Sequence, residues 1–339
     1  MTHSFRLGRA VLAFALACGT LYGMAMPAHA SIARTCTTYT LPVRIADPGP
    51  ADQTLWGQLC YPGSARPATV QLLVHGATYN HLYWDFPVGN GYYSYVDAAL
   101  AAGYATFNVD RVGAGNSSHP ASGPLNLPAG AVALHDVITA LRSGALDGHA
   151  FSHVAWIGHS LGSFIALYEI PRYHDVDAVI LTGGLHGINP QVATIIYPAA
   201  QDPKFANSGL DSGYVTTVPG DRSFFYDPAT SDPNVIAADE ANKDVATFTP
   251  SPPVPTPVDI TVPVLLVSGQ RDKAQCVGVT LYDCSNPASV LAYESQFYLP
   301  QAHLELKMIP DTGHVVALST TAPLTDAIML GWLLSHQGP

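Results

Sequence analysis

The chain has 339 residues, with 14 lysines and arginines against 25 aspartates and glutamates, so its formal net charge at pH 7 is −11. This charge argues against a nucleic-acid partner, because phosphate backbones are held by clustered basic side chains. Hydrophobic residues make up 48% of the chain and charged residues 12%. That composition excludes an intrinsically disordered protein, and the length suits one large domain or two small ones.

The first 30 residues have the pattern of a secretory signal. Two arginines precede an apolar stretch at about residues 10–26, and Ala28-His29-Ala30 offers a small-residue cleavage site. Glycine and polar residues interrupt the apolar stretch, which falls short of the ~20 residues that a membrane span needs. We therefore expect a secreted protein, cleaved after Ala30, without a membrane span. Lipid attachment at Cys18 is the alternative, on a loose match to a lipid-attachment box.

The number of cysteines fits this prediction of export. Loss of the signal removes Cys18 and leaves four of the five cysteines, an even number in a compartment that favours disulfides. Three pairings are possible. We favour Cys36 with Cys60, in neighbouring strand-like runs, and Cys276 with Cys284, which would close a short loop. Four free thiols remain the alternative, and no C-x-x-C motif predicts a zinc site.

From residue 37 onward, short β-branched runs alternate with helical stretches, which is typical of an α/β protein with a mostly parallel sheet. The expected strands are an opening hairpin at 37–45 and 54–61, then 70–74, 105–109, 154–158, 178–181, 264–267 and 305–309. The expected helices are 92–102, 129–141, 161–170, 288–297 and a closing helix through Trp332. That last helix contains Pro323 and Asp326, so we expect it to pack on the sheet rather than to cross a membrane.

The regular alternation stops at about residues 186–260. This stretch is rich in Asp, Asn and Pro, is too long for a simple crossover, and leads into six prolines between residues 250 and 263. Because proline keeps the preceding residue extended, the exit from the stretch should not be helical. We expect an inserted cap over the sheet, within a single domain of residues 31–339.

A candidate nucleophile lies between a predicted strand and a predicted helix. The segment is Gly158-His159-Ser160-Leu161-Gly162, a G-x-S-x-G motif. A serine on such a sharp turn needs flanking glycines, and the turn lifts its hydroxyl clear of the sheet. The helix that follows directs its amino-terminal N–H groups at any anion that forms there. We therefore predict that Ser160 is catalytic.

Two partners for Ser160 follow in the order acid, then histidine, that this topology requires. Asp272 comes shortly after the strand at 264–267, and His314 comes after the strand at 305–309. Two other acids compete with Asp272. Asp110 also follows a strand but precedes Ser160, and Asp311 is so close to His314 that it more readily shapes the turn.

These residues identify the chain as similar to the α/β-hydrolase superfamily, of the capped kind with a Ser-His-Asp triad. The resemblance covers residues 54–337. It rests on His75-Gly76, on the segment from Asp110 to Gly115, on the motif around Ser160, on Asp272 and on Gly313-His314.

The resemblance implies a role for each matching residue. Ser160 is the nucleophile, His314 the general base and then acid, and Asp272 orients the histidine. The oxyanion hole would take its two N–H donors from Leu161 and Ala77. An ordinary tight turn at His75-Gly76 remains the alternative for the second donor.

The substrate is inferred from aromatic residues near the predicted site. Tyr79, Trp84, His186 and Phe225 are candidate pocket residues, and they favour a small lipophilic or aromatic ester, lactone or thioester. The same rings could instead fill the interface between cap and sheet. Amide or carbon–carbon bond cleavage by the same triad, and a non-catalytic binding protein on the same fold, remain alternatives.

No cofactor and no metal are expected, because no dinucleotide, phosphate-loop or metal motif is complete. The sequence does not predict the oligomeric state.

Overall fold

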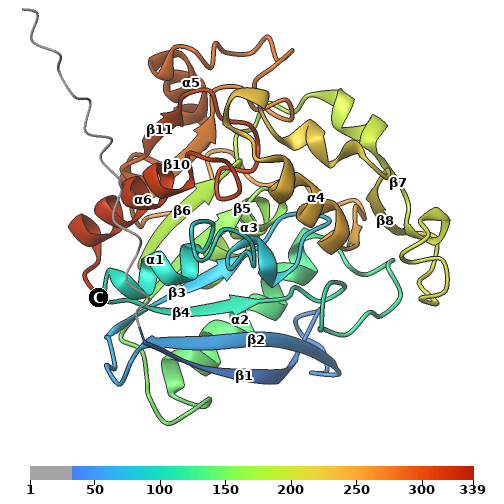
Figure 1. Ribbon diagram of the computed structural model, residues 1–339. Coiled ribbons are helices and arrows are strands. Elements are labelled where there is room, and N and C mark those ends of the chain that lie inside the picture. Colours follow the sequence, from blue (N-terminus) through green and yellow to red (C-terminus); the bar gives the residue numbers. More distant parts are fainter. Residues whose placement is uncertain (1–32) are drawn as a thin grey trace, which may run out of the picture. The chain divides into compact units, whose positions relative to one another are not determined.

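The computed structural model describes residues 33–339, so the predicted signal of residues 1–30 and Cys18 lie outside the described residues. Eight strands form one sheet in the spatial order β1-β2-β4-β3-β5-β6-β10-β11 (Figure 1). The six strands from β4 to β11 pair in parallel, whereas β1 and β2 are antiparallel. The mostly parallel sheet predicted from the sequence is confirmed. The strands are β1 (Arg34–Val43), β2 (Gln53–Pro62), β3 (Thr69–Val74), β4 (Ala105–Val109), β5 (His153–His159), β6 (Ala178–Thr182), β10 (Val264–Gly269) and β11 (Glu305–Ile309).

The opening hairpin is held by a disulfide. Cys36 lies directly opposite Cys60 in the register of β1 and β2, and the two sulfurs are bonded. A second disulfide joins Cys276 to Cys284 in the loop after β10. These are the two pairs that the sequence analysis favours.

Helices cover both faces of the sheet. They are α1 (Tyr95–Ala101), α2 (Leu127–Ser143), α3 (Leu161–Tyr173), α5 (Pro287–Glu294) and α6 (Ala322–His336). Side chains of β5 alternate between two apolar cores: Val154 and Trp156 pack with α2 and α3, whereas Ala155 and Ile157 pack with α1 and α6. This alternation follows from the two-residue period of a strand, and the interior of β5, residues 154–158, is apolar because both faces are buried.

Helix caps explain where the observed boundaries differ from the predicted ones. The Asn126 side chain accepts a hydrogen bond from the Ala129 N–H, and Gly144 ends α2 in a left-handed conformation, so α2 extends beyond residues 129–141 at both ends. The Ser94 hydroxyl caps α1 through the Asp97 N–H, which starts the helix three residues later than predicted. α5 gives way to a 3₁₀ turn before Phe297.

Residues 186–260 form an insertion between β6 and β10 that consists mainly of short elements. Three strands form a separate antiparallel sheet: β7 (Ile196–Pro198), β8 (Tyr214–Thr217) and β9 (Ala246–Thr247). The insertion has one α-helix, α4 (Pro233–Asn242). The 3₁₀ helices of the described chain are His81–Tyr83, Pro190–Ile195, Ala199–Gln201, Asp221–Phe225, Pro228–Thr230, Ser295–Phe297 and Pro300–Ala302. Among residues 33–339, no helix has the length and apolar character needed to cross a membrane.

A buried acid in α6 should make folding sensitive to pH. Asp326 is buried and its Oδ1 has no hydrogen-bond partner, and burial raises its pKa to about 8. The folded state therefore holds a proton that the unfolded chain loses near pH 4, so stability should fall as the pH rises from about 4 to 8. We expect Asp326→Asn to remove this fall and to raise the free energy of unfolding at pH 7 by at most about 4 kcal/mol.

Urea denaturation at pH 5 and at pH 7.5 measures the effect. Asp52→Asn, which removes the same charge from an exposed loop, is the matched control and should leave the pH dependence unchanged. An unaltered pH dependence in Asp326→Asn would contradict the assignment.

Candidate active site

The three predicted catalytic residues follow three strands of the parallel sheet. Ser160 follows β5, Asp272 lies beyond β10, and His314 lies beyond β11. Parallel strands present their carboxyl ends at one edge of the sheet, where ligand sites of open α/β sheets lie. Ser160 and His314 line one cavity. Asp272 does not line this cavity but forms a hydrogen bond with His314.

The turn that carries Ser160 is strained and closely packed. Ser160 has φ +50° and ψ −114°, in a region that non-glycine residues rarely adopt. Its N–H donates to the Thr182 carbonyl at 2.8 Å, and α3 begins at the next residue. A side chain at Gly162 would collide with the Val74 carbonyl oxygen at the end of β3. Gly162 of the G-x-S-x-G motif is therefore needed because the backbone of β3 lies directly against it, as the motif predicts.

His314 is oriented by a buried carboxylate. Its Nδ1 lies 2.8 Å from Oδ2 of Asp272, whose side chain is fully buried. The other carboxylate oxygen, Oδ1, accepts hydrogen bonds from the N–H groups of Ala274 at 2.7 Å and Gln275 at 3.2 Å. These bonds fix the acid at the start of a loop that the Cys276–Cys284 disulfide closes.

The two competing acids have other partners. Asp110 accepts hydrogen bonds from the N–H groups of His81 and Asn116, so it organises its own loop. Asp311 has a largely exposed side chain and a positive φ of 49°, which agrees with a role in the turn before His314.

Ser160 and His314 face the same cavity, and no hydrogen bond joins them in the described chain. Among residues 33–339, no hydrogen bond joins the Ser160 hydroxyl to His314, although both line the cavity. Such bonds are often long in ligand-free enzymes and shorten when substrate binds.

The predicted oxyanion donors are available. Ala77 and Leu161 both line the cavity with Ser160. In the described part of the chain, neither N–H donates a hydrogen bond to another residue. The Leu161 N–H also stands at the amino terminus of α3, where the helix dipole favours a negative charge. The pair can thus stabilise a developing oxyanion.

Arg111 supports the loop before Ala77 from the sheet side. Its guanidinium donates to the carbonyls of His75 at 3.2 Å and Gly76 at 3.1 Å. The backbone N–H of Arg111 donates to Nε2 of His75. Burial lowers the pKa of His75 to about 3, so this imidazole stays neutral and accepts that bond. The backbone conformation of the loop is therefore fixed by an internal hydrogen-bond network.

Arg222, from the insertion, holds the other end of this loop. The side chain is fully buried, and its Nη1 donates to the Thr78 hydroxyl at 2.7 Å and the Thr78 carbonyl at 3.3 Å. Thr78 itself has φ +60°, and the guanidinium stacks 3.9 Å from the centre of the Tyr79 ring. Asp239 neutralises the charge through a 2.5 Å ion pair.

The cavity beside Ser160 has a volume of about 140 Å³ and mostly apolar walls. Of the four predicted pocket residues, Tyr79 and Phe225 line it. Trp84 does not, because it is fully buried against Tyr83 and Tyr95. His186 lines a different cavity, where its Nδ1 lies 2.7 Å from the buried Glu294 carboxylate.

Sequence reasoning missed several lining residues and assigned no role to Arg111 or Arg222. The insertion supplies Ile188, Val192, Ile196 and Phe248 to the cavity walls. A larger cavity of about 220 Å³ adjoins this one, and Leu161 and Phe248 line both. Arg222 could have been found only as an unusual basic residue beside the Phe224-Phe225 pair, which gives no indication of its partner.

Comparison with known proteins assigns the family. A family model described as the alpha/beta hydrolase family matches residues 71–327. The chain belongs to this family. The sequence matches no curated protein at a significant level.

Solved structures of two esterases and of an epoxide hydrolase share the fold. A carboxylesterase from Bacillus subtilis is 15% identical, with 87% of this chain and 90% of that chain covered and a TM-score of 0.57. A thermophilic esterase from Thermogutta terrifontis is 17% identical, with 89% and 100% covered and a TM-score of 0.57. An epoxide hydrolase is 14% identical, with 89% and 99% covered and a TM-score of 0.55. Because neighbours named for different reactions share the fold, the fold does not fix the reaction.

The contact between Arg222 and Thr78 should govern how well the Ala77 N–H is aimed. In the double variant Arg222→Met/Asp239→Asn, both charges are removed together, so no buried charge is stranded. We expect the second-order rate at which a fluorophosphonate labels Ser160 to fall about tenfold or more, since that reaction also develops an oxyanion.

Tyr226→Phe is the matched control. It removes another hydrogen bond to Asp239, 2.9 Å long, without touching Thr78, so labelling should stay near the wild-type rate. Equal loss in both variants, or no loss in the double variant, would contradict the role given to Arg222.

Proposed function

We propose that this alpha/beta hydrolase is a secreted serine hydrolase that cleaves a carboxylic ester, lactone or thioester of a lipophilic or aromatic substrate. One observation carries the proposal. Ser160, His314 and the free N–H groups of Ala77 and Leu161 surround one apolar cavity, while Asp272 binds the far side of the imidazole. This is the arrangement that acyl transfer to a serine hydroxyl requires.

The hydrogen bond to Asp272 determines which ring nitrogen of His314 carries the proton. With Nδ1–H donating to Oδ2 of Asp272, Nε2 is left as the base that accepts the proton of Ser160. The Ser160 oxygen attacks the carbonyl carbon, and the oxyanion accepts hydrogen bonds from the Ala77 and Leu161 N–H groups. His314 then donates the proton to the leaving alkoxide or thiolate, which departs as the acyl-enzyme forms.

Water completes the reaction. His314 takes a proton from the water as it attacks the acyl-enzyme carbonyl, and returns that proton to Ser160 Oγ as the second tetrahedral intermediate collapses. The acid product and the free enzyme result. The two halves use the same base and the same donors.

The cavity walls support an uncharged substrate. Tyr79, Phe164, Ile188, Phe225 and Phe248 contribute apolar surface, and the described residues that line the cavity include no Lys, Arg, Asp or Glu. A charged group on the substrate would lose its hydration there without compensation. A neutral acyl or aryl group of modest size fits instead.

Other reactions of the same fold are distinguished by chemistry at position 160. Epoxide hydrolysis through an alkyl-enzyme ester needs a carboxylate nucleophile, whereas residue 160 is serine. Amide or carbon–carbon bond cleavage would use the same triad, and a substrate panel of ester, lactone, thioester and peptide compounds separates them. If the protein were a non-catalytic binding protein, a fluorophosphonate would leave Ser160 unlabelled.

Replacement of the nucleophile tests the proposal directly. We expect Ser160→Ala to lower kcat for a short p-nitrophenyl ester by at least about 10³-fold and to abolish fluorophosphonate labelling. Ser163→Ala, one turn further along α3, is the matched control: its buried hydroxyl bonds to the Thr182 carbonyl at 3.0 Å and has no place in the mechanism. Undiminished turnover by Ser160→Ala would overturn the assignment.

Secretion is tested separately. Two disulfides in the described chain are consistent with an oxidising compartment. When the full chain is expressed in a bacterial host, we expect the exported product to begin at Ser31, as read by mass spectrometry of its amino-terminal peptide. Retention of residues 1–30, or lipid on Cys18, would contradict cleavage after Ala30.

A further inference from the structure

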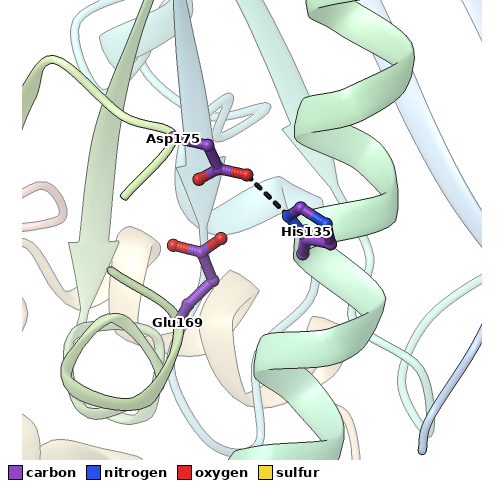
Figure 2. Close-up of side chains that lie close together, drawn as sticks. All are labelled: His135, Glu169 and Asp175. Atoms are coloured by element: carbon purple, nitrogen blue, oxygen red, sulfur yellow. Dashed lines mark hydrogen bonds and ion pairs between the residues drawn. The ribbon is translucent and has the colours of Figure 1, made fainter. Parts of the chain in front are cut away.

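A second group of functional side chains lies away from Ser160, between α2 and α3. His135 projects from α2, Glu169 from α3, and Asp175 from the loop that leads into β6 (Figure 2). One donor atom from each residue lies within 4.8 Å of the other two. Ser160 immediately precedes α3, and Glu169 lies nine residues further along the chain, so the group is about 14 Å from Ser160 along the helix axis.

Glu169 is the unusual member of this group. Its side chain is fully buried, and neither carboxylate oxygen has a hydrogen-bond partner. One oxygen of Asp175 also lacks a partner. Within residues 33–339, no basic side chain forms an ion pair with Glu169; the one ion pair within this group joins His135 to Asp175. Buried carboxylates are normally paired, hydrogen-bonded or bound to a metal.

The other two ligands are held in place and reachable from solvent. His135 Nδ1 lies 2.6 Å from Asp175 Oδ2, and the imidazole stacks on the Tyr173 ring with centroids 3.7 Å apart and planes 4° apart. The Asp175 carbonyl accepts a hydrogen bond from Arg142 Nε at 2.8 Å, which anchors the loop. The side chains of His135 and Asp175 are 23% and 16% exposed, so an ion could enter from their side.

We propose that His135, Glu169 and Asp175 bind a divalent transition-metal ion of the Zn²⁺ type. One imidazole nitrogen and two carboxylate oxygens form a ligand set that suits Zn²⁺ better than the oxygen-only sites that Ca²⁺ and Mg²⁺ prefer. The ion would give both carboxylates a positive partner, and water would complete the coordination. Unlike a catalytic metal, it would have no contact with Ser160.

The competing explanation is a proton in place of the ion. Burial and the neighbouring Asp175 raise the pKa of Glu169 well above its usual range, so a neutral Glu169 could share a proton with Asp175. Both explanations satisfy the electrostatics of the buried carboxyl. They differ in whether the folded protein takes up a metal.

A bound ion would tie three segments of the fold together. It would link α2, α3 and the connection to β6, all on the same face of the sheet. A ligand that binds only the folded state stabilises it by mass action. We therefore expect a rise in Tm with added Zn²⁺ and little change in hydrolytic activity.

Zinc uptake by the complete, tag-free exported protein tests the proposal. After chelator treatment and dialysis, Zn²⁺ binding is measured by calorimetry and by metal analysis, together with Tm. Wild type should bind one equivalent, and Glu169→Gln, which keeps the shape of the side chain, should weaken binding at least about tenfold. This variant keeps every histidine of the protein, so nonspecific Zn²⁺ binding to surface histidines is unchanged.

Glu294→Gln is the matched control, because Glu294 is equally buried and pairs with His186, but among the described residues it belongs to no group of three potential ligands. It should bind Zn²⁺ as wild type does. If Glu169→Gln does not fold, Co²⁺ bound to the wild type should give d–d absorption bands that an equimolar amount of Zn²⁺ removes. Absence of saturable binding, or equal binding by wild type and Glu169→Gln, would overturn the site in favour of the shared proton. Displacement of Zn²⁺ by equimolar Ca²⁺ would overturn the metal class.

Discussion

The backbone around Ser160 lies against the end of β3, and the rest of the site depends on this contact. At Gly162 there is no room for a β-carbon beside the Val74 carbonyl, and at Gly76 a β-carbon would lie 3.1 Å from that of Ser160. The strained serine and the loop with Ala77 are therefore neighbours because two backbones touch. The positive φ of Ser160 destabilises the folded state, and the packing of β3, β5 and α3 against one another offsets this cost.

Two arginines then hold the loop that carries Ala77 around that contact. Arg111 holds the loop from the sheet side and Arg222 holds it from the insertion, and both guanidiniums bond to backbone carbonyls. In the proposed reaction, the N–H of Ala77 would be oriented before any substrate arrives, so little reorganisation would remain for the chemical step. The insertion thus contributes to the geometry of the loop that carries Ala77 as well as to the walls of the cavity.

The sequence was informative wherever a local signal was sufficient. That Ser160, Asp272 and His314 lie close together was predictable, because each follows a recognisable strand and parallel strands end at one edge. Trp84 and His186 were misplaced because aromatic composition says nothing of the direction in which a ring points. Arg222 was missed because the short 3₁₀ helices of the insertion have no periodicity from which its contact with Thr78, 144 residues earlier, could be read.

The two unpaired buried acids of the described chain, Asp326 and Glu169, show why burial alone does not define a site. Asp326 lies on the buried side of α6, and in the described chain no imidazole or second carboxylate shifts its pKa, so protonation is the available way to remove its charge. Glu169 faces His135 and Asp175, whose own lone pairs can share a cation. The surroundings of a buried carboxyl, rather than its desolvation, decide whether it binds a proton or an ion. This difference separates an acid that affects only stability from one that can hold a ligand.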